Sequence, residues 1–336
     1  MRLLIVTQAV DTEDPVLGFF VRWIEEFARA TRSLGEVGKH VERIEVICLK
    51  LGKFNFPKNV RVHSLGKERG SGNRIMYAWR FLSLAWRLRR DYDAVFVHMN
   101  PEYVILGGIL WRLLDKRVAL WYTHKSVNAK LRLAAFFSNV IFTASKESFR
   151  LNSRKVRVMG HGIDVDFFAP DPGTPRGTAV LSAGRLSPTK RHDLVIRAAE
   201  HFGNEVRIAG TGPEQQRLEE LASRLSLSAR VHFLGPQMQK QLREEYRTAG
   251  VFVHASETGS LDKVVLEALA CGLPVVTTSA SLTDMPVTVV AATPDAIAKA
   301  VLTIHSVDTQ PLVAYVKECH SLQHLIPRIT EIIETL

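Results

Sequence analysis

The sequence predicts an α/β protein built from two doubly wound parallel sheets, each with helices on both faces. Three observations predict this class. Short β-branched, apolar runs alternate with helical patterns along the chain. A stretch rich in proline and glycine interrupts this alternation once, near the middle, and indicates a linker. The chain has 336 residues and is 46% hydrophobic, which is sufficient for two domains of ordinary size.

The first half opens with a predicted strand at 2–8 and a predicted helix at 16–32, which together form a βα unit. The helix carries Trp23, Ile24 and Phe27 on its apolar side. Further strands are predicted at 43–49, 60–63, 94–98, 118–122, 140–143 and 156–158, and further helices at 74–90, 103–114 and 145–151.

The second half repeats the alternation. Strands are predicted at 179–183, 206–209, 231–234, 251–254 and 274–277, and helices at 192–202, 214–225, 240–249, 261–271 and 294–302. The predicted organisation is therefore an N-terminal domain at 1–165, a linker at 166–178, a C-terminal domain at 179–309 and a helical segment at 310–336.

The net charge of +10 is unevenly distributed. Residues 1–167 contain 28 Lys and Arg against 16 Asp and Glu, so the basic character belongs to the first half. Nucleic acid, an anionic membrane surface and a phosphorylated substrate are each compatible with it. The chain carries no recognised nucleic-acid motif, which disfavours the first of these.

Apolar runs and cysteines indicate the compartment. No apolar run reaches the roughly 18 residues that a membrane-spanning helix needs, and the first run is too short for a signal peptide. The three cysteines lie far apart, so neither a disulfide framework nor a metal cluster is predicted. We expect a cytoplasmic protein.

The segment 250–276 contains a strand, a glycine turn, a helix and a second strand. Glu267 is the only polar side chain in 264–271, so we expect a buried helix in which another group donates a hydrogen bond to Glu267. The turn before the helix lies at the carboxyl edge of the predicted sheet, where open α/β folds bind ligands. The candidate binding residues at this edge are Gly259, Ser260, Leu261, Asp262 and Lys263.

Arg185 and Lys190 follow the predicted strand 179–183 and precede a helix, so both emerge at the same edge. Two cations there suit a diphosphate, because Arg binds a phosphate bidentately and Lys supplies a mobile point charge. Together they offset the charge that grows on a leaving group. The alternative interpretation is a solvated basic loop.

Three glycines are candidates for close approach to a ligand. Gly210 and Gly212 follow the predicted strand 206–209, where their backbone suits either a phosphate contact or a plain tight turn. Gly18 ends the loop after the first strand, and a donor phosphate contact competes there with a helix-start turn. Because this loop lacks G-x-G-x-x-G, a nicotinamide cofactor is disfavoured.

The order of these motifs resembles that of glycosyltransferase family 4 enzymes with the GT-B fold. Those enzymes carry G-R-x-x-x-x-K where this chain has 184–190, and E-G-F-G-L-V-x-L-E followed by G-x-P-V-V where it has 259–276. The resemblance implies that Arg185 and Lys190 bind the diphosphate of a donor and that Glu267 holds its ribose hydroxyls.

The resemblance also assigns residues outside these two motifs. The segment 231–236 is similar to the family's V-x-F-x-G, so the backbone at Leu234 and Gly235 is expected to contact the base. His124 follows the predicted strand 118–122 and matches a family histidine near the donor sugar. A hydrogen-bonded structural histidine is the alternative.

The chain departs from the family pattern in the sugar-contacting half of the motif. The first Glu of the pattern falls on Gly259, and Glu257 lies two residues early. Asp262 and Lys263 replace the usual Gly-Leu. The nucleotide-contacting half, which contains Glu267, matches.

The resemblance implies two Rossmann-like domains facing each other across a cleft, with the last helix crossing back to the first domain. It further implies transfer of a sugar, with retention, from a nucleotide-diphosphate donor to a glycan, glycolipid or polyprenyl-linked acceptor bound by the N-terminal domain. No metal or other cofactor is expected, since the D-x-D at 91–93 precedes a strand at its amino end. A nucleotide-sugar epimerase or hydrolase and a catalytically silent nucleotide-sugar-binding protein are the alternatives.

The segment 74–90 predicts a basic amphipathic helix. One stripe of the helix is apolar and consists of Ile75, Trp79, Leu82 and Trp86, and another is basic and consists of Arg80, Ser83, Arg87 and Arg90. Two interpretations stay open. The helix either packs on the sheet with a solvated outer face, or it docks on anionic lipid and makes the protein peripheral on the inner face of a membrane.

Overall fold

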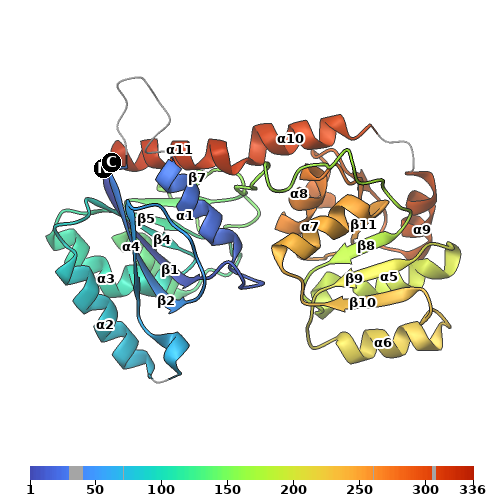
Figure 1. The fold of residues 1–336 in the computed structure, drawn as a ribbon, viewed down its shortest axis with the longest axis horizontal. Coiled ribbons are helices and arrows are strands. Elements are labelled where there is room, and N and C mark those ends of the chain that lie inside the picture. Colours follow the sequence, from blue (N-terminus) through green and yellow to red (C-terminus); the bar gives the residue numbers. More distant parts are fainter. Residues whose placement is uncertain (30–40, 71, 260, 305–307) are drawn as a thin grey trace. The chain divides into compact units, whose positions relative to one another are not determined.

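The structure, a computed structural model, describes residues 1–29, 41–70, 72–259, 261–304 and 308–336. It divides into two compact units, one of Met1–Gly162 with Leu322–Leu336 and one of Ile163–Ser321. Each unit contains one parallel sheet with helices on both faces, so the predicted α/β class is confirmed (Figure 1).

The first unit has a seven-stranded sheet in the order β3-β2-β1-β4-β5-β6-β7, with every neighbouring pair parallel. Its strands are β1 (Arg2–Val10), β2 (Arg43–Leu51), β3 (Val60–Ser64), β4 (Ala94–His98), β5 (Arg117–Trp121), β6 (Val140–Thr143) and β7 (Val156–Val158). Its helices are α1 (Phe19–Arg29), α2 (Arg74–Arg87), α3 (Pro101–Leu113), α4 (Ala129–Phe137) and α11 (Leu322–Glu334).

Alternate residues of these strands supply two separate cores. Leu3 and Ile5 pack with α1 and α11, whereas Leu4 and Val6 pack with the buried residues of α2, α3 and α4. This alternation follows from the two-residue period of a strand. Because both faces are covered, the strands are nearly continuous apolar runs, which is why the sequence predicts them closely.

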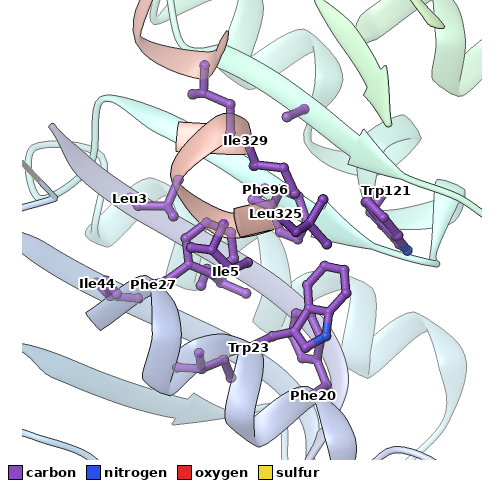
Figure 2. Packing of buried hydrophobic residues seen from close by; sticks show 14 of the residues in the cluster. Leu3, Ile5, Phe20, Trp23, Phe27, Ile44, Phe96, Trp121, Leu325 and Ile329 are labelled. Carbon is purple, nitrogen blue, oxygen red and sulfur yellow. The ribbon is translucent and has the colours of Figure 1, made fainter. Parts of the chain in front are cut away.

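The C-terminal helix α11 belongs to the first unit, as predicted. Leu325 and Ile329 point into the same core as Trp23 and Phe27 of α1 (Figure 2). Arg117 of β5 donates hydrogen bonds to the carbonyls of the last turn, Ile333 at 3.1 Å and Glu334 at 2.9 Å. These carbonyls have no partner within the helix, so the arginine caps it.

The second unit has a six-stranded parallel sheet in the order β10-β9-β8-β11-β12-β13. Residues of α5, α6 and α9 pack on one face, and residues of α7, α8 and α10 pack on the other. The strands are β8 (Val180–Ala183), β9 (Val206–Ala209), β10 (Val231–Gly235), β11 (Val251–His254), β12 (Val275–Thr277) and β13 (Thr288–Val289). The helices are α5 (His192–Ala198), α6 (Gln215–Arg224), α7 (Gln239–Thr248), α8 (Lys263–Ala270), α9 (Pro294–Thr303) and α10 (Gln310–His320).

Two predicted features of the first unit are wrong. The segment 145–151 is a turn, in which the hydroxyl of Ser145 accepts the N–H of Ser148 and competes with helical hydrogen bonding. A helix that the sequence analysis missed, α4, lies before it, where the side chain of Asn128 accepts the N–H of Leu131 and caps the start. The predicted helix end at 30–32 lies outside the described residues.

Most of the apolar stripe of helix α2 faces away from the sheet, although Leu82 packs against the core. Its fully buried residues are Phe81 and Ala85, whereas Ile75, Trp79 and Trp86 are 80%, 68% and 51% exposed. The helix packs on the sheet, as one interpretation expects, and its docking on anionic lipid stays a prediction. Its outer face is apolar and basic.

The docking of α11 gives the first testable prediction. Ile329→Ala removes a fully buried side chain from the first core, and we expect it to destabilise this unit by about 2–5 kcal/mol. Urea unfolding followed by tryptophan fluorescence measures the change. Glu331→Ala, exposed on the same helix, is the control and is expected to stay within about 0.5 kcal/mol of the wild type. Equal effects of the two changes would contradict the packing of α11.

Candidate functional site

The strand order of the second unit reverses between β8 and β11. From β8 the chain passes through α5 on one face to β9, and from β11 it passes through α8 on the other face to β12. The loops after β8 and β11 meet at the carboxyl ends of these two strands. Open α/β sheets bind ligands at this topological switch point. The candidate site is the pair of loops at 184–191 and 255–262.

Glycines hold the loops after β8 and β9 together. A Cβ atom on Gly210 would lie 1.9 Å from the carbonyl oxygen of Gly184, and one on Gly212 would lie 2.2 Å from that of Leu186. Gly210 also has φ +136°, which side-chain-bearing residues rarely adopt. Close packing of two backbones accounts for both glycines, and their contact with a ligand stays a prediction.

Lys190 and Asp262 join the two loops of the site. The ammonium group of Lys190 forms an ion pair with Oδ2 of Asp262, and Nε2 of His254 lies 2.8 Å from the same oxygen. His254 ends β11, and its Nδ1 lies 3.0 Å from Oγ1 of Thr277 on β12. Burial opposes ionisation of Asp262, but the hydrogen bond from His254 and the charge of Lys190 outweigh it and lower its pKa to about 2. The carboxylate therefore stays charged at neutral pH.

A second pair of contacts joins the same loops. Arg191 of the first loop forms an ion pair with Glu257 of the second loop. Arg191 also forms an ion pair with Asp193 of α5, at 3.1 Å. The N–H of Glu257 donates to the carbonyl oxygen of Thr189 at 2.9 Å. Two charge pairs and one backbone hydrogen bond thus fasten the loop at 255–262 to the loop at 184–191.

Glu267 lies on the buried side of α8 and is 5% exposed. Its Oε2 accepts a hydrogen bond from the hydroxyl of Tyr246 at 3.3 Å, and its Oε1 lies 3.4 Å from the ammonium group of Lys263. The predicted donor to this carboxylate is confirmed, and α7 supplies it. Burial, followed by the charge of Glu267, raises the pKa of Tyr246, so its hydroxyl keeps its proton and donates.

Arg185 is exposed at the start of the first loop. Its guanidinium makes no hydrogen bond or ion pair with any other residue that the structure describes. It is therefore available to an anion that reaches the site.

The remaining predicted site residues of this unit lie at strand ends or beside α8. Gly259 has φ +58°, as the predicted turn requires, and Ser260 lies outside the described residues. Leu261 and Leu234 are partly buried against the core that contains α8, and Gly235 accepts the N–H of Gly210 at 2.8 Å. Helix α8 begins only at Lys263, so the turn at Gly259 is not itself the helix start.

Two predicted site residues lie in the first unit. His124 follows β5 and is exposed, and its Nδ1 accepts the N–H of Ser126 at 3.1 Å. Gly18 precedes α1 in a turn where its N–H donates to Asp14 at 2.9 Å and a Cβ would lie 2.6 Å from the same carbonyl oxygen. That close approach accounts for the glycine as a helix-start turn.

Three residues that contact the ion pairs of this site were not predicted from the sequence, namely His254, Arg191 and Thr277. His254 was placed at the end of a strand, which is where parallel sheets present functional side chains, and this signal could have found it. Arg191 contacts Glu257, which lies 66 positions away in the chain, and Thr277 contacts His254, which lies 23 positions away. Thr277 also ends a predicted strand, whereas nothing in the local sequence marks Arg191.

Sequence relatives match the part of the chain that carries this site. Residues 170–291 match the family described as glycosyl transferases group 1. Over 151 residues the chain is 36% identical to the D-inositol 3-phosphate glycosyltransferase of Mycobacteroides abscessus. The aligned region covers 40% of this chain and 33% of that protein. The match thus spans about a third of the length of this curated relative.

Solved structures match the chain over its whole length. HepE of Anabaena, solved in complex with UDP, matches 100% of both chains with a TM-score of 0.74 and 16% identity. The chain has the GT-B fold. The predicted fold and the resemblance to glycosyltransferases are confirmed. The UDP-GlcNAc 2-epimerase of Methanocaldococcus jannaschii also matches 100% of both chains, with a TM-score of 0.60 and 14% identity, so the GT-B fold alone does not decide the reaction.

Buried His192, which begins α5 next to the site, gives the second prediction. Burial, followed by the charge of Lys190, lowers its pKa to about 4. An unfolded chain binds this proton near pH 6.5, so stability is lost as the pH falls from 6.5 toward 4. Between pH 6.5 and 5 we expect the wild type to lose about 2 kcal/mol more than His192→Asn, as measured by urea unfolding. His201→Asn, half-exposed in the same unit, is expected to keep the wild-type pH dependence. Parallel pH profiles for wild type and His192→Asn would contradict the buried, neutral histidine.

Proposed function

We propose that this GT-B chain is a glycosyltransferase that takes a nucleotide-diphosphate sugar at the candidate site of the second unit and transfers the sugar with retention. One observation carries the proposal. A buried carboxylate, Glu267, shares the switch point of the sheet with two cations, Arg185 and Lys190. Cations suit the diphosphate, and a fixed carboxylate suits the two ribose hydroxyls, which are hydrogen-bond donors. The glycosyltransferase activity of the partial sequence relative supports the same conclusion.

The proposed chemistry depends on charge stabilisation. The bond between the anomeric carbon and the diphosphate breaks, and Arg185 and Lys190 offset the charge that develops on the departing oxygen. The acceptor oxygen bonds to the anomeric carbon, and its proton passes to the departing diphosphate, so no protein base is needed. Glu267 fixes the nucleoside, which helps to place the reacting atoms. No metal ion is part of this proposal.

The acceptor is proposed to reach the first unit from an anionic membrane surface. A hollow of about 370 Å³ on α2 is lined by Arg69, Arg80 and Arg87 together with Trp79. Exposed Ile75 and Trp86 continue the apolar stripe along the helix. Basic side chains that alternate with exposed tryptophan suit the boundary between lipid headgroups and acyl chains. Within the described residues, no helix combines the length and apolarity needed to span a bilayer.

The third prediction tests the nucleotide assignment. Glu267→Gln keeps the size of the side chain but removes its charge, and we expect the Kd for UDP or GDP to rise at least roughly tenfold, a loss of about 1.4 kcal/mol. Isothermal titration calorimetry measures it. Glu220→Gln, exposed on α6, is the control and should bind as the wild type does. The same Kd is expected in excess chelator. An unchanged Kd for Glu267→Gln would exclude the ribose contact.

The reaction itself is decided by incubation with radiolabelled nucleotide sugars, with and without a lipid-linked acceptor. Label that moves to the acceptor supports transfer. Free sugar formed without acceptor indicates a hydrolase, and an epimerised donor indicates an epimerase. Binding without turnover on any acceptor indicates a silent binding protein.

The fourth prediction tests the membrane surface. Arg80→Glu, Arg87→Glu and Arg90→Glu together reverse the basic stripe, and we expect binding to vesicles of phosphatidylglycerol to fall at least roughly tenfold in a flotation assay, since each basic residue contributes about 1 kcal/mol. A control with the same charge change replaces the exposed Arg150, Arg154 and Arg157 with Glu and should retain most of the binding. Equal losses in both triple variants would show that net charge alone governs binding and would remove the role of α2.

A further inference from the structure

Asp262 and Lys263 are neighbours of opposite charge at the start of α8, and each contacts a group of the proposed donor site. Asp262 pairs with Lys190, a proposed diphosphate contact. Lys263 lies one helical turn before Glu267, the proposed ribose contact, with its Nζ 3.4 Å from Oε1. The two residues stand where the resembling family pattern has the uncharged pair Gly-Leu.

Both contacts are held in place by the surrounding structure. Asp262 is only 16% exposed and is also bound by His254, which Thr277 holds from the neighbouring strand. Lys263 is constrained because it occupies the first position of α8, so its side chain lies along the same helix face as Glu267. The side chains therefore do not need to move far to keep these pairs.

We propose that Asp262 and Lys263 act as an internal substitute for the donor's charges and thereby weaken binding of nucleoside diphosphates. This inference rests on the proposed function. A diphosphate must take Lys190 from Asp262, and a ribose must take Glu267 from Lys263. Binding then exchanges one ion pair for another, so the net gain is smaller than the gain from pairing two unpartnered groups.

The carboxylate of Asp262 also opposes binding of the diphosphate by charge repulsion. When the diphosphate binds Lys190, Asp262 remains fixed beside His254, only a few ångströms from the new negative charge. Its pKa of about 2 leaves it ionised across the physiological range. Like charges at that separation in a partly buried site repel strongly. Affinity must therefore come largely from contacts other than the diphosphate, such as those to base and sugar.

Removing both charges tests the inference. The double variant Asp262→Gly with Lys263→Leu restores the uncharged pair of the resembling pattern. We expect its Kd for UDP or GDP, measured by isothermal titration calorimetry, to fall at least roughly tenfold. Asp262→Asn, which keeps the shape of the side chain, is expected to give an intermediate gain, and thermal unfolding of each variant confirms that it is folded.

Salt dependence gives a second readout. In the wild type, Lys190 exchanges one ion pair for another and Arg185 forms a new one, so the Kd should rise only modestly between 50 and 300 mM NaCl. In the double variant, the diphosphate forms a new pair with Lys190, so salt should weaken binding more steeply. Glu220→Gln is the control, because it removes an exposed carboxylate of α6 in the same unit that lies outside both loops of the site. It should change the Kd less than twofold.

The outcomes separate this inference from the function on which it rests. Tighter, more salt-sensitive binding by the double variant supports both. If the wild type binds UDP or GDP and the double variant binds equally or more weakly, the internal substitution is overturned while the donor site stands. If neither protein binds any nucleoside diphosphate, the proposed function itself fails.

Discussion

The reversal of strand order between β8 and β11 is the constraint on which the candidate site depends. Helices α5 and α8, which follow these neighbouring strands, pack on opposite faces of the sheet. The loops that carry Lys190 and Asp262 meet at the ends of these strands, although the two residues are 72 positions apart. The hydrogen bond between Tyr246 and Glu267 lies in the core beneath α8, the helix that follows the second of these loops.

The charges at this site balance one another within the chain. Lys190 pairs with Asp262, Arg191 with Glu257, and Lys263 with Glu267. Partly buried charges require such partners, because an unpaired one is costly to desolvate. The consequence for binding is that a ligand must compete with the protein's own groups. For the proposed nucleotide donor, we therefore infer that affinity depends on a difference between ion pairs and not only on the number of cations present.

In the first unit, the notable feature is how the helices cover the two faces of the sheet. Its sheet is covered on one face by α1 and α11, which share Trp23 and Ile329 in one core, and on the other by α2, α3 and α4. Phe81 and Ala85 are the fully buried residues of α2, and Trp79 and Trp86 on the same helix are exposed. Exposed aromatic groups beside arginines are the basis of the proposal that this surface meets a partner.

The sequence by itself determined the α/β class, nearly every strand and the burial of Glu267, because strands covered on both faces must be apolar and a carboxylate among apolar helix residues must find a donor. It did not determine which residue donates, that α4 forms while 145–151 turns, which side of α2 faces outward, or that Asp262 meets Lys190 and His254. Only the tertiary structure decided these. Local patterns set the period and polarity of a segment, whereas the partner of a charge and the orientation of a helix depend on contacts between residues far apart in the chain.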